Sequence, residues 1–224
     1  MDLKLLREAT RPEHEATETA VALTGPGMTR EAYISTLQRF HGVVCAWDKI
    51  AAAEAPAAYA DLVRQRRRCG SLEEDLRFFG APAGEHASES LLGEMRALIG
   101  NPEQGDAHQR DSRFLGAMYV VEGSTLGGQY IAHQVETDLN LQPGQGDRFF
   151  RGYGKETMPK WREFQQVLAA LPEPQTEHVI AAAKAMFGIF RSWLAPAASS
   201  NAENLRNSEN VSGERLPTGW AEAS

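Results

Sequence analysis

The sequence Glu122-Gly123-Ser124-Thr125-Leu126-Gly127-Gly128-Gln129 lies inside a longer segment, Phe114 to Leu139, whose apolar periodicity predicts one long α-helix. Three glycines fall within six residues there, and each costs a helix interior roughly 1 kcal/mol relative to alanine. A buried helix that accepts this cost usually lets another group approach its backbone closely. That group is either a neighbouring helix or a flat apolar ligand, and the glycines alone do not distinguish the two.

The remainder of the chain reads as a single all-α domain over residues 1–195. Residues 196–224 are rich in Ser, Asn, Glu and Ala, with few apolar groups, and this composition predicts a disordered tail. Helical periodicity, caps and Gly or Pro stops predict further helices over 3–23, 30–54, 71–79, 88–99, 157–171 and 174–194, with a shorter one before Gly70.

Composition excludes several classes of function. The net charge is -7, and an acidic chain is a poor nucleic-acid binder. No apolar run is long enough to span a bilayer, so no membrane partner is expected. Cys45 and Cys69 are too few for a disulfide framework, and we find no His or paired carboxylate at a useful spacing from them. A reducing, cytoplasmic setting therefore fits the two cysteines best.

The basic run Arg64-Gln65-Arg66-Arg67-Arg68 has two interpretations. It is either a docking surface for an acidic partner or a solvated helix end, where cations are favoured by the helix dipole.

His14 is the histidine with the most informative surroundings. At helical spacing, Arg7, Arg11, His14 and Glu18 fall on one side of the first predicted helix. This face offers an imidazole, a carboxylate to orient it and two cations that suit an anionic ligand. A solvent-facing helix with ordinary charge pairs gives the same pattern. Pro12 places His14 either after a bend or near the true start of the helix.

Familiar catalytic motifs are missing from the sequence. It contains no HExxH zinc helix, no P-loop, no GxSxG elbow and no ExxH pair of a di-iron bundle. Gly123 and Gly127, four residues apart, line one side of their helix. A flat ligand against that side, held on its other side by a histidine from another helix, would explain both features.

Two stretches resemble the heme-binding helices of the heme oxygenases. Leu6 to Glu18, LREATRPEHEATE, is similar to their proximal helix, and Phe114 to Gln129, FLGAMYVVEGSTLGGQ, is similar to their distal helix. Tyr153-Gly154-Lys155-Glu156-Thr157, with Trp161 and Phe164 after it, resembles a third patch of the bacterial members. The resemblance covers the whole predicted domain and is greatest to the bacterial branch, some members of which serve phytochromes.

The resemblance implies that His14 is the proximal ligand to heme iron, with Glu18 beside it. It implies that Gly123 and Gly127 let heme lie against the distal backbone and that Gly128 helps the helix bend. It also implies that Arg7 and Arg11 bind the propionates, with Arg162 as a weaker candidate. Phe187 is implied to pack near the ring.

Ser124 departs from the animal enzymes, which carry an aspartate after the first distal glycine to organise water around bound oxygen. Gly123, Ser124 and Gly127 are the residues implied to act at the oxygen side. The Ser124 hydroxyl, the Gly123 carbonyl and Gln129 are the candidates for holding the distal water, in that order.

The implied activity is cleavage of heme, which serves as both substrate and cofactor, by O2 to biliverdin, CO and ferrous iron. Electrons come from an external donor such as a ferredoxin or a flavodoxin-type reductase, because the sequence has no flavin or nicotinamide motif. A bacteriophytochrome is a possible acceptor of the biliverdin. Two alternatives stay open: a heme-binding or heme-sequestering protein without turnover, and a thiaminase-like helical hydrolase that uses a carboxylate and a cysteine.

Overall fold

The longest helix, α6, carries the glycine-marked segment and forms the centre of the fold. The computed structural model describes residues 1–21, 27–84, 88–100 and 106–196. These residues form helices and no strand, so the all-α prediction is confirmed. The helices are α1 (Leu3–Val21), α2 (Arg30–Glu54), α3 (Ala60–Arg64), α4 (Cys69–Phe78), α5 (Glu89–Ile99), α6 (Ala107–Leu139), α7 (Thr157–Ala169) and α8 (Thr176–Leu194), with short 3₁₀ turns at Ala57–Tyr59, Glu173–Gln175 and, as η2, Gly154–Glu156.

Helix α6 begins earlier than its apolar pattern predicts. The Asp106 side chain accepts the backbone N–H of His108 at 2.9 Å and caps the helix ahead of Ala107. Its end agrees with the prediction, since Leu139 is the last helical residue and Asn140 takes the left-handed conformation at φ 52°. A polar first turn and a long apolar interior are therefore one continuous helix.

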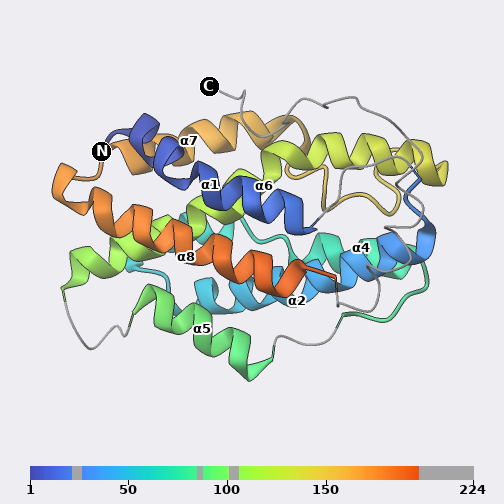
Figure 1. Cartoon of the computed structure of the whole chain (residues 1–224), viewed down its shortest axis with the longest axis horizontal. Helices are drawn as coiled ribbons and strands as arrows, with labels where there is room; N and C mark the ends of the chain where they lie inside the picture. Colours follow the sequence, from blue (N-terminus) through green and yellow to red (C-terminus); the bar gives the residue numbers. More distant parts are fainter. Residues whose placement is uncertain (22–26, 85–87, 101–105, 197–224) are drawn as a thin grey trace.

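Helix α8 packs along α6 and α1, and it also contacts α2 and α5 (Figure 1). Gly116 of α6 permits the closest approach, because a Cβ there would overlap the Val179 carbonyl oxygen and the Ala182 side chain of α8. The largest fully buried side chains, including Phe114, Phe164 and Leu6, belong to one core cluster that these helices share with α7. Among the described residues, no helix is long and apolar enough to cross a membrane.

Helix α1 runs through Pro12. Proline removes the donor that would bond the carbonyl of Glu8, but Glu8 is exposed, so water can take that place. His14 therefore keeps the helical register with the residues on either side of Pro12. The predicted end of this helix at residue 23 falls in 22–26, outside the described residues.

The start of α4 differs from the prediction. We expected Gly70 to end one helix and Ser71 to cap the next, but α4 begins at Cys69 and contains both residues. Asp48 of α2 is the reason, because its carboxylate accepts the backbone N–H groups of Arg68 and Cys69, each at 2.8 Å. The cap comes from another helix, and a local sequence pattern does not reveal it.

Other predicted boundaries agree with the structure. Thr29 and Ser88 are the N-caps of α2 and α5, and each side chain accepts a backbone N–H of the first turn. The segment between α6 and α7 is irregular, as its glycines predict. The predicted tail over 196–224 lies, apart from its first residue, outside the described residues.

Candidate functional site

A cavity of about 480 Å³ lies among α1, α6, α7 and α8. It brings together five residues that the sequence singled out. These are His14, Arg7 and Arg11 from α1, Gly123 from α6 and Phe187 from α8. The other lining residues are Leu3, Lys4, Glu8, Thr10, Tyr119, Val120, Leu126, Trp161, Gln165 and Leu168. The walls are thus mainly apolar and aromatic, and the charged side chains come from α1.

His14 is partly covered, with 21% of its side chain exposed. Its Nδ1 lies 3.7 Å from Oε2 of Glu18, one turn further along α1. The imidazole ring meets the Phe187 ring edge to face, with centroids 5.5 Å apart. Burial lowers the pKa of His14, although the charge of Glu15 acts in the opposite direction. A neutral imidazole, the form that binds a metal, is therefore favoured at neutral pH.

Cationic side chains lie at one side of the cavity. Lys4, Arg7 and Arg11 line it and are exposed, and Arg11 and Lys4 form weak ion pairs along the helix with Glu15 and Glu8 at 3.7 and 3.9 Å. In a chain of net charge -7 this is a local concentration of positive charge, suited to an anionic ligand group.

Arg162, the weaker candidate for the same role, is exposed on α7 and does not line the cavity. Its neighbour Trp161 does, together with Gln165 and Leu168, and these three share one face of the helix. A residue one position from that face points elsewhere.

The three glycines of the distal segment have different surroundings. Gly123 borders the cavity, and a Cβ added there would meet only the Trp161 ring, at 3.9 Å. Gly128 packs against the loop before α7, because a Cβ there would overlap the Phe150 carbonyl oxygen. Gly127 is buried and does not line the cavity. Ligand access and close packing, the two interpretations of this segment, thus apply to different glycines.

The Ser124 hydroxyl is engaged inside the protein. It donates to the Val121 carbonyl at 2.7 Å and accepts from Nη2 of Arg68 at 2.9 Å. Ser124 and Gln129 do not line the cavity, whereas Gly123 does.

Arg66 and Arg68 are the residues that the sequence interpretation missed. Both are buried, at 3% and 4% exposure, so half of the run's four arginines belong to neither a docking surface nor a solvated helix end. Arg66 pairs with Glu122 of α6 at 2.5 Å and with Glu163 of α7 at 2.6 Å. The Tyr153 hydroxyl donates to the second oxygen of Glu122 at 2.8 Å, and burial raises the pKa of Tyr153.

Glu122 was the available signal for this network. An acidic residue inside an apolar helical run needs a cationic or hydrogen-bonding partner once it is buried. Arg66, Glu122 and Glu163 do not line the cavity, so the network holds the residue next to Gly123 without entering the cavity.

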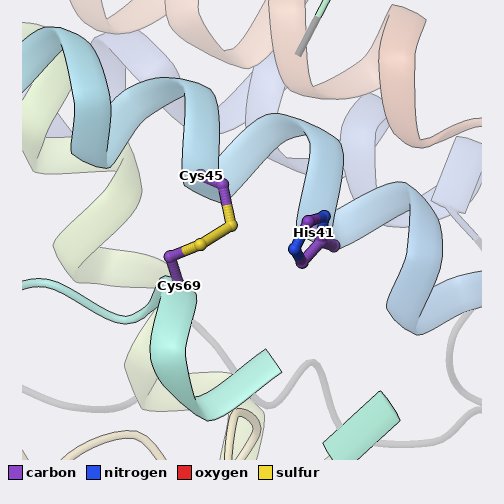
Figure 2. A group of neighbouring side chains, drawn as sticks. All are labelled: His41, Cys45 and Cys69. Atoms are coloured by element: carbon purple, nitrogen blue, oxygen red, sulfur yellow. A yellow bond between two sulfur atoms is a disulfide. The ribbon is translucent and has the colours of Figure 1, made fainter. Parts of the chain in front are cut away.

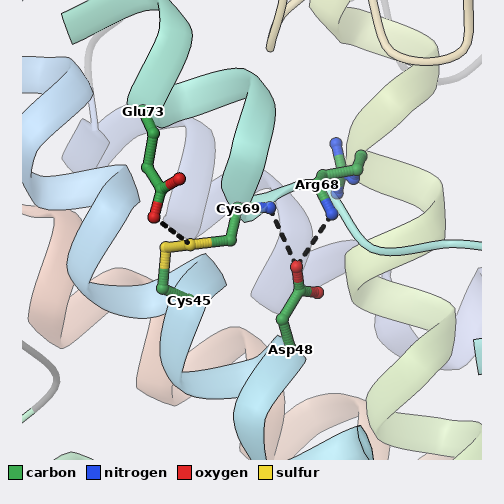
Figure 3. The surroundings of a disulfide bond; sticks show 5 residues. All are labelled: Cys45, Asp48, Arg68, Cys69 and Glu73. Atoms are coloured by element: carbon green, nitrogen blue, oxygen red, sulfur yellow. Dashed lines mark hydrogen bonds between the residues drawn. A yellow bond between two sulfur atoms is a disulfide. The ribbon is translucent and has the colours of Figure 1, made fainter. Parts of the chain in front are cut away.

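Cys45 and Cys69 form a disulfide between α2 and the start of α4, with Cα atoms 4.8 Å apart (Figure 3). The expectation that the two cysteines stay separate is therefore wrong for this structure, whereas the reducing, cytoplasmic setting stays a prediction. The statement that no His stands at a useful spacing is also wrong. His41 precedes Cys45 by four residues and Glu73 follows Cys69 by four. The disulfide leaves the hydrolase alternative without a thiol nucleophile.

Comparison with known proteins gives a consistent result. The sequence model of the heme oxygenase family matches residues 2–196. A heme oxygenase from Xanthomonas campestris pv. campestris (strain 8004) is 28% identical over 168 residues, which cover 74% of this chain and 90% of that protein.

Two solved structures share the fold. Heme oxygenase from Leptospira interrogans superimposes with a TM-score of 0.69 at 19% identity, over 85% of this chain and 97% of that one. Heme oxygenase-1 from the cyanobacterium Synechocystis sp. PCC 6803, solved in complex with heme, gives a TM-score of 0.66 at 16% identity, over 91% and 94% of the two chains.

Proposed function

Since the chain belongs to the heme oxygenase family and is thus a heme-degrading oxidoreductase, we propose that heme binds in the cavity between α1 and α6. There its ring is opened by O2 to biliverdin, with release of CO and ferrous iron. The observation that carries the proposal is that His14 of α1 and Gly123 of α6 line one cavity whose walls on α6, α7 and α8 are mainly apolar.

The residues that line the cavity fit heme in their chemistry. Tyr119, Trp161 and Phe187 supply flat apolar surface for a porphyrin. Lys4, Arg7 and Arg11 supply charge for its two propionates, with Arg162 held as a more distant candidate. His14, kept neutral by burial, ligates the iron, and Glu18 orients the ring through Nδ1 so that Nε2 is left for the metal.

The side of the cavity lined by Gly123 is the side proposed for O2. A glycine there keeps the helix backbone accessible, because no Cβ stands between it and a bound ring. The Gly123 carbonyl replaces the Ser124 hydroxyl as the first candidate for holding a distal water, since Ser124 is already bonded to Arg68 and Val121. Gly128 acts one step away, by allowing α6 to pack closely against the loop before α7, and Gly127 is buried next to it.

When bound, heme supplies the redox-active iron and the ring that is attacked. The chain supplies an axial imidazole, cations that set the orientation of the ring, and apolar walls that limit access of water. Electrons are proposed to come from an external ferredoxin or flavodoxin-type reductase. Of the basic run, only Arg64 and Arg67 are exposed and available for such docking. A bacteriophytochrome remains the proposed acceptor of the product.

Turnover of bound hemin tests the proposal. The heme-free protein is loaded with one equivalent of hemin, reduced under air in the presence of catalase, and followed by its absorbance spectrum. Catalase removes free peroxide, which would otherwise bleach heme without the enzyme. We expect the Soret band to disappear, a broad red biliverdin band to grow, and CO to be captured by added ferrous myoglobin.

A Soret band that persists through reduction under air would support the non-catalytic heme-binding alternative instead. The His133→Ala variant is a matched control for histidine substitutions, because His133 is exposed on α6 and does not line the cavity. Its turnover should equal that of the unmodified protein.

A further inference from the structure

Three metal-ligand side chains, His41, Cys45 and Cys69, meet where α2 packs against the start of α4, and the Glu73 carboxylate lies next to Cys69. His41 and Cys45 are one helical turn apart on α2, and Cys69 and Glu73 are one turn apart on α4. Figure 2 shows the His41 ring beside the two cysteines. We propose that, once the disulfide is reduced, Cys45, Cys69 and His41 bind a zinc ion, with Glu73 as the fourth ligand.

The distances suit a tetrahedral ion. The two sulfur atoms and an imidazole nitrogen of His41 lie within 4.8 Å of one another, and Oε1 of Glu73 lies 3.7 Å from Sγ of Cys69 (Figure 3). Zinc bonds of about 2.0 to 2.3 Å in tetrahedral geometry separate neighbouring ligand atoms by roughly 3.3 to 3.8 Å. Breaking the disulfide frees the sulfur atoms to move apart by side-chain rotation, without a change in the separation of the helices.

The frame of the site is held independently of the disulfide. Asp48, one turn beyond Cys45, accepts the backbone N–H groups of Arg68 and Cys69 and fixes the start of α4 on α2 (Figure 3). Cys69 is the first residue of α4, so this cap fixes the position of its backbone. Reduction therefore leaves two cysteines whose backbones stay in place.

The proposed ligands differ in how deeply they are buried. His41 is buried, Cys45 and Cys69 are half-buried, and Glu73 is exposed. An ion would thus sit at the edge of the core with one carboxylate toward solvent, where it can enter and leave. Two thiolates and an imidazole select a thiophilic ion such as Zn²⁺ over Mg²⁺ or Ca²⁺, which prefer all-oxygen sites.

The disulfide and the zinc site exclude each other. A dithiol reductant transfers two electrons and two protons to the Cys45–Cys69 bond and itself becomes a disulfide. Zinc then binds the two sulfurs, and both thiol protons leave to solvent. None of the four ligands lines the cavity between α1 and α6, so this site is separate from the proposed heme site.

Cobalt titration of the full-length, heme-free protein tests the inference. The protein is reduced anaerobically with a phosphine, freed of reductant and titrated with Co²⁺, which reports tetrahedral thiolate ligation by its absorbance. We expect one Co²⁺ per chain, with thiolate-to-cobalt charge-transfer bands, and stoichiometric displacement by Zn²⁺. The oxidised protein should show no thiolate-to-cobalt charge-transfer bands.

Variants assign the ligands. Cys45→Ser and Cys69→Ser should each abolish the charge-transfer bands, and His41→Ala or His41→Gln should weaken Co²⁺ binding by roughly tenfold or more. Glu73→Gln should weaken it as well. His133→Ala should bind as the unmodified protein does, and the circular dichroism of each variant checks its fold.

The inference is overturned if the reduced protein gives no thiolate-to-cobalt bands, or if either serine variant keeps them. Unchanged affinity in both folded His41 variants would contradict the assignment of His41, and unchanged affinity in Glu73→Gln would contradict that of Glu73.

Discussion

The carboxylate of Asp75 is buried and accepts the backbone N–H groups of Arg148 and Phe149 at 2.9 and 2.8 Å. It thereby holds the loop whose next residue, Phe150, packs on Gly128 of α6. Burial raises the pKa of Asp75 to about 6, although both hydrogen bonds act to lower it and Asp147 adds to the increase.

This pKa gives a pH dependence of known sign. A carboxyl group whose pKa is higher in the folded than in the unfolded state binds more protons when folded. Its contribution to stability is therefore present below about pH 4 and is lost as the pH rises to about 6. We expect this contribution to fall by about 1 to 3 kcal/mol across that window.

Urea unfolding between pH 4 and 7 measures this contribution. It is the difference in the free energy of unfolding between the unmodified protein and Asp75→Asn at each pH. Asp61→Asn, at an exposed acid of α3, is the matched control and should leave the pH profile unchanged. A difference between the unmodified protein and Asp75→Asn that stays constant from pH 4 to 6 would contradict the raised pKa.

Single residues also show how far sequence reasoning reaches. The spacing of His14 and Glu18 predicted their pairing, because four residues along a helix fix the distance between side chains. The partner of Ser124 was not predictable in this way, because Arg68 lies 56 residues earlier in the chain. A local pattern contains no information about which distant side chain reaches a given hydroxyl.

At the scale of elements, α6 uses glycine for two purposes that substitutions can separate. Gly123→Ala adds a methyl group where the heme-free protein has room, so we expect it to raise the free energy of unfolding by up to about 1 kcal/mol. The same methyl group faces the cavity and should weaken hemin binding by roughly tenfold or more. Gly128→Ala should lower the free energy of unfolding by about 1 to 3 kcal/mol.

Urea unfolding and hemin titration of the two variants provide this comparison. The opposite signs are the test, because helix propensity alone would stabilise both variants equally. Equal stabilities, or unchanged hemin affinity in Gly123→Ala, would show that the two glycines do not differ as proposed.

The connection between α3 and α4 is anchored to α6 by buried charge. Replacing Arg66 with Met leaves Glu122 buried without its cation, which should cost about 3 to 5 kcal/mol of unfolding free energy. Arg67→Met, at the exposed neighbour, should change it by less than about 0.5 kcal/mol. The double variant Arg66→Met/Glu122→Leu should lose less unfolding free energy than the two single variants lose together. We expect the difference to be about 0.5 to 3 kcal/mol.

Denaturant unfolding of the two single variants and the double variant measures the coupling free energy between Arg66 and Glu122. Strictly additive losses would mean that Arg66 and Glu122 stabilise the protein independently, against the network described here.

At the scale of the whole molecule, the sequence was most informative where the determining contacts are local. The cap at Thr29 and the apolar period of α6 depend on neighbours within a few residues, and the structure has them. The start of α4, the burial of Arg66 and the Cys45–Cys69 pairing depend on how α2, α4 and α6 pack. Those three features were missed for the same physical reason, since each is created by tertiary contact.

The cavity is also a property of the whole molecule, because α1, α6, α7 and α8 each supply part of its wall. The α1 motif and the α6 motif were visible in the sequence, separated by about a hundred residues. Their meeting at one cavity required the fold, and the site is functional only if His14 binds the iron there.

Resonance Raman spectroscopy of the ferrous heme complex tests this claim most directly. We expect an iron–histidine stretching band in the unmodified protein and in His133→Ala, and its loss in His14→Ala. Added imidazole should restore axial ligation in the variant, because the cavity would remain and only the tethered ligand would be gone. An unchanged iron–histidine band in His14→Ala would contradict the account, since another histidine would then hold the heme.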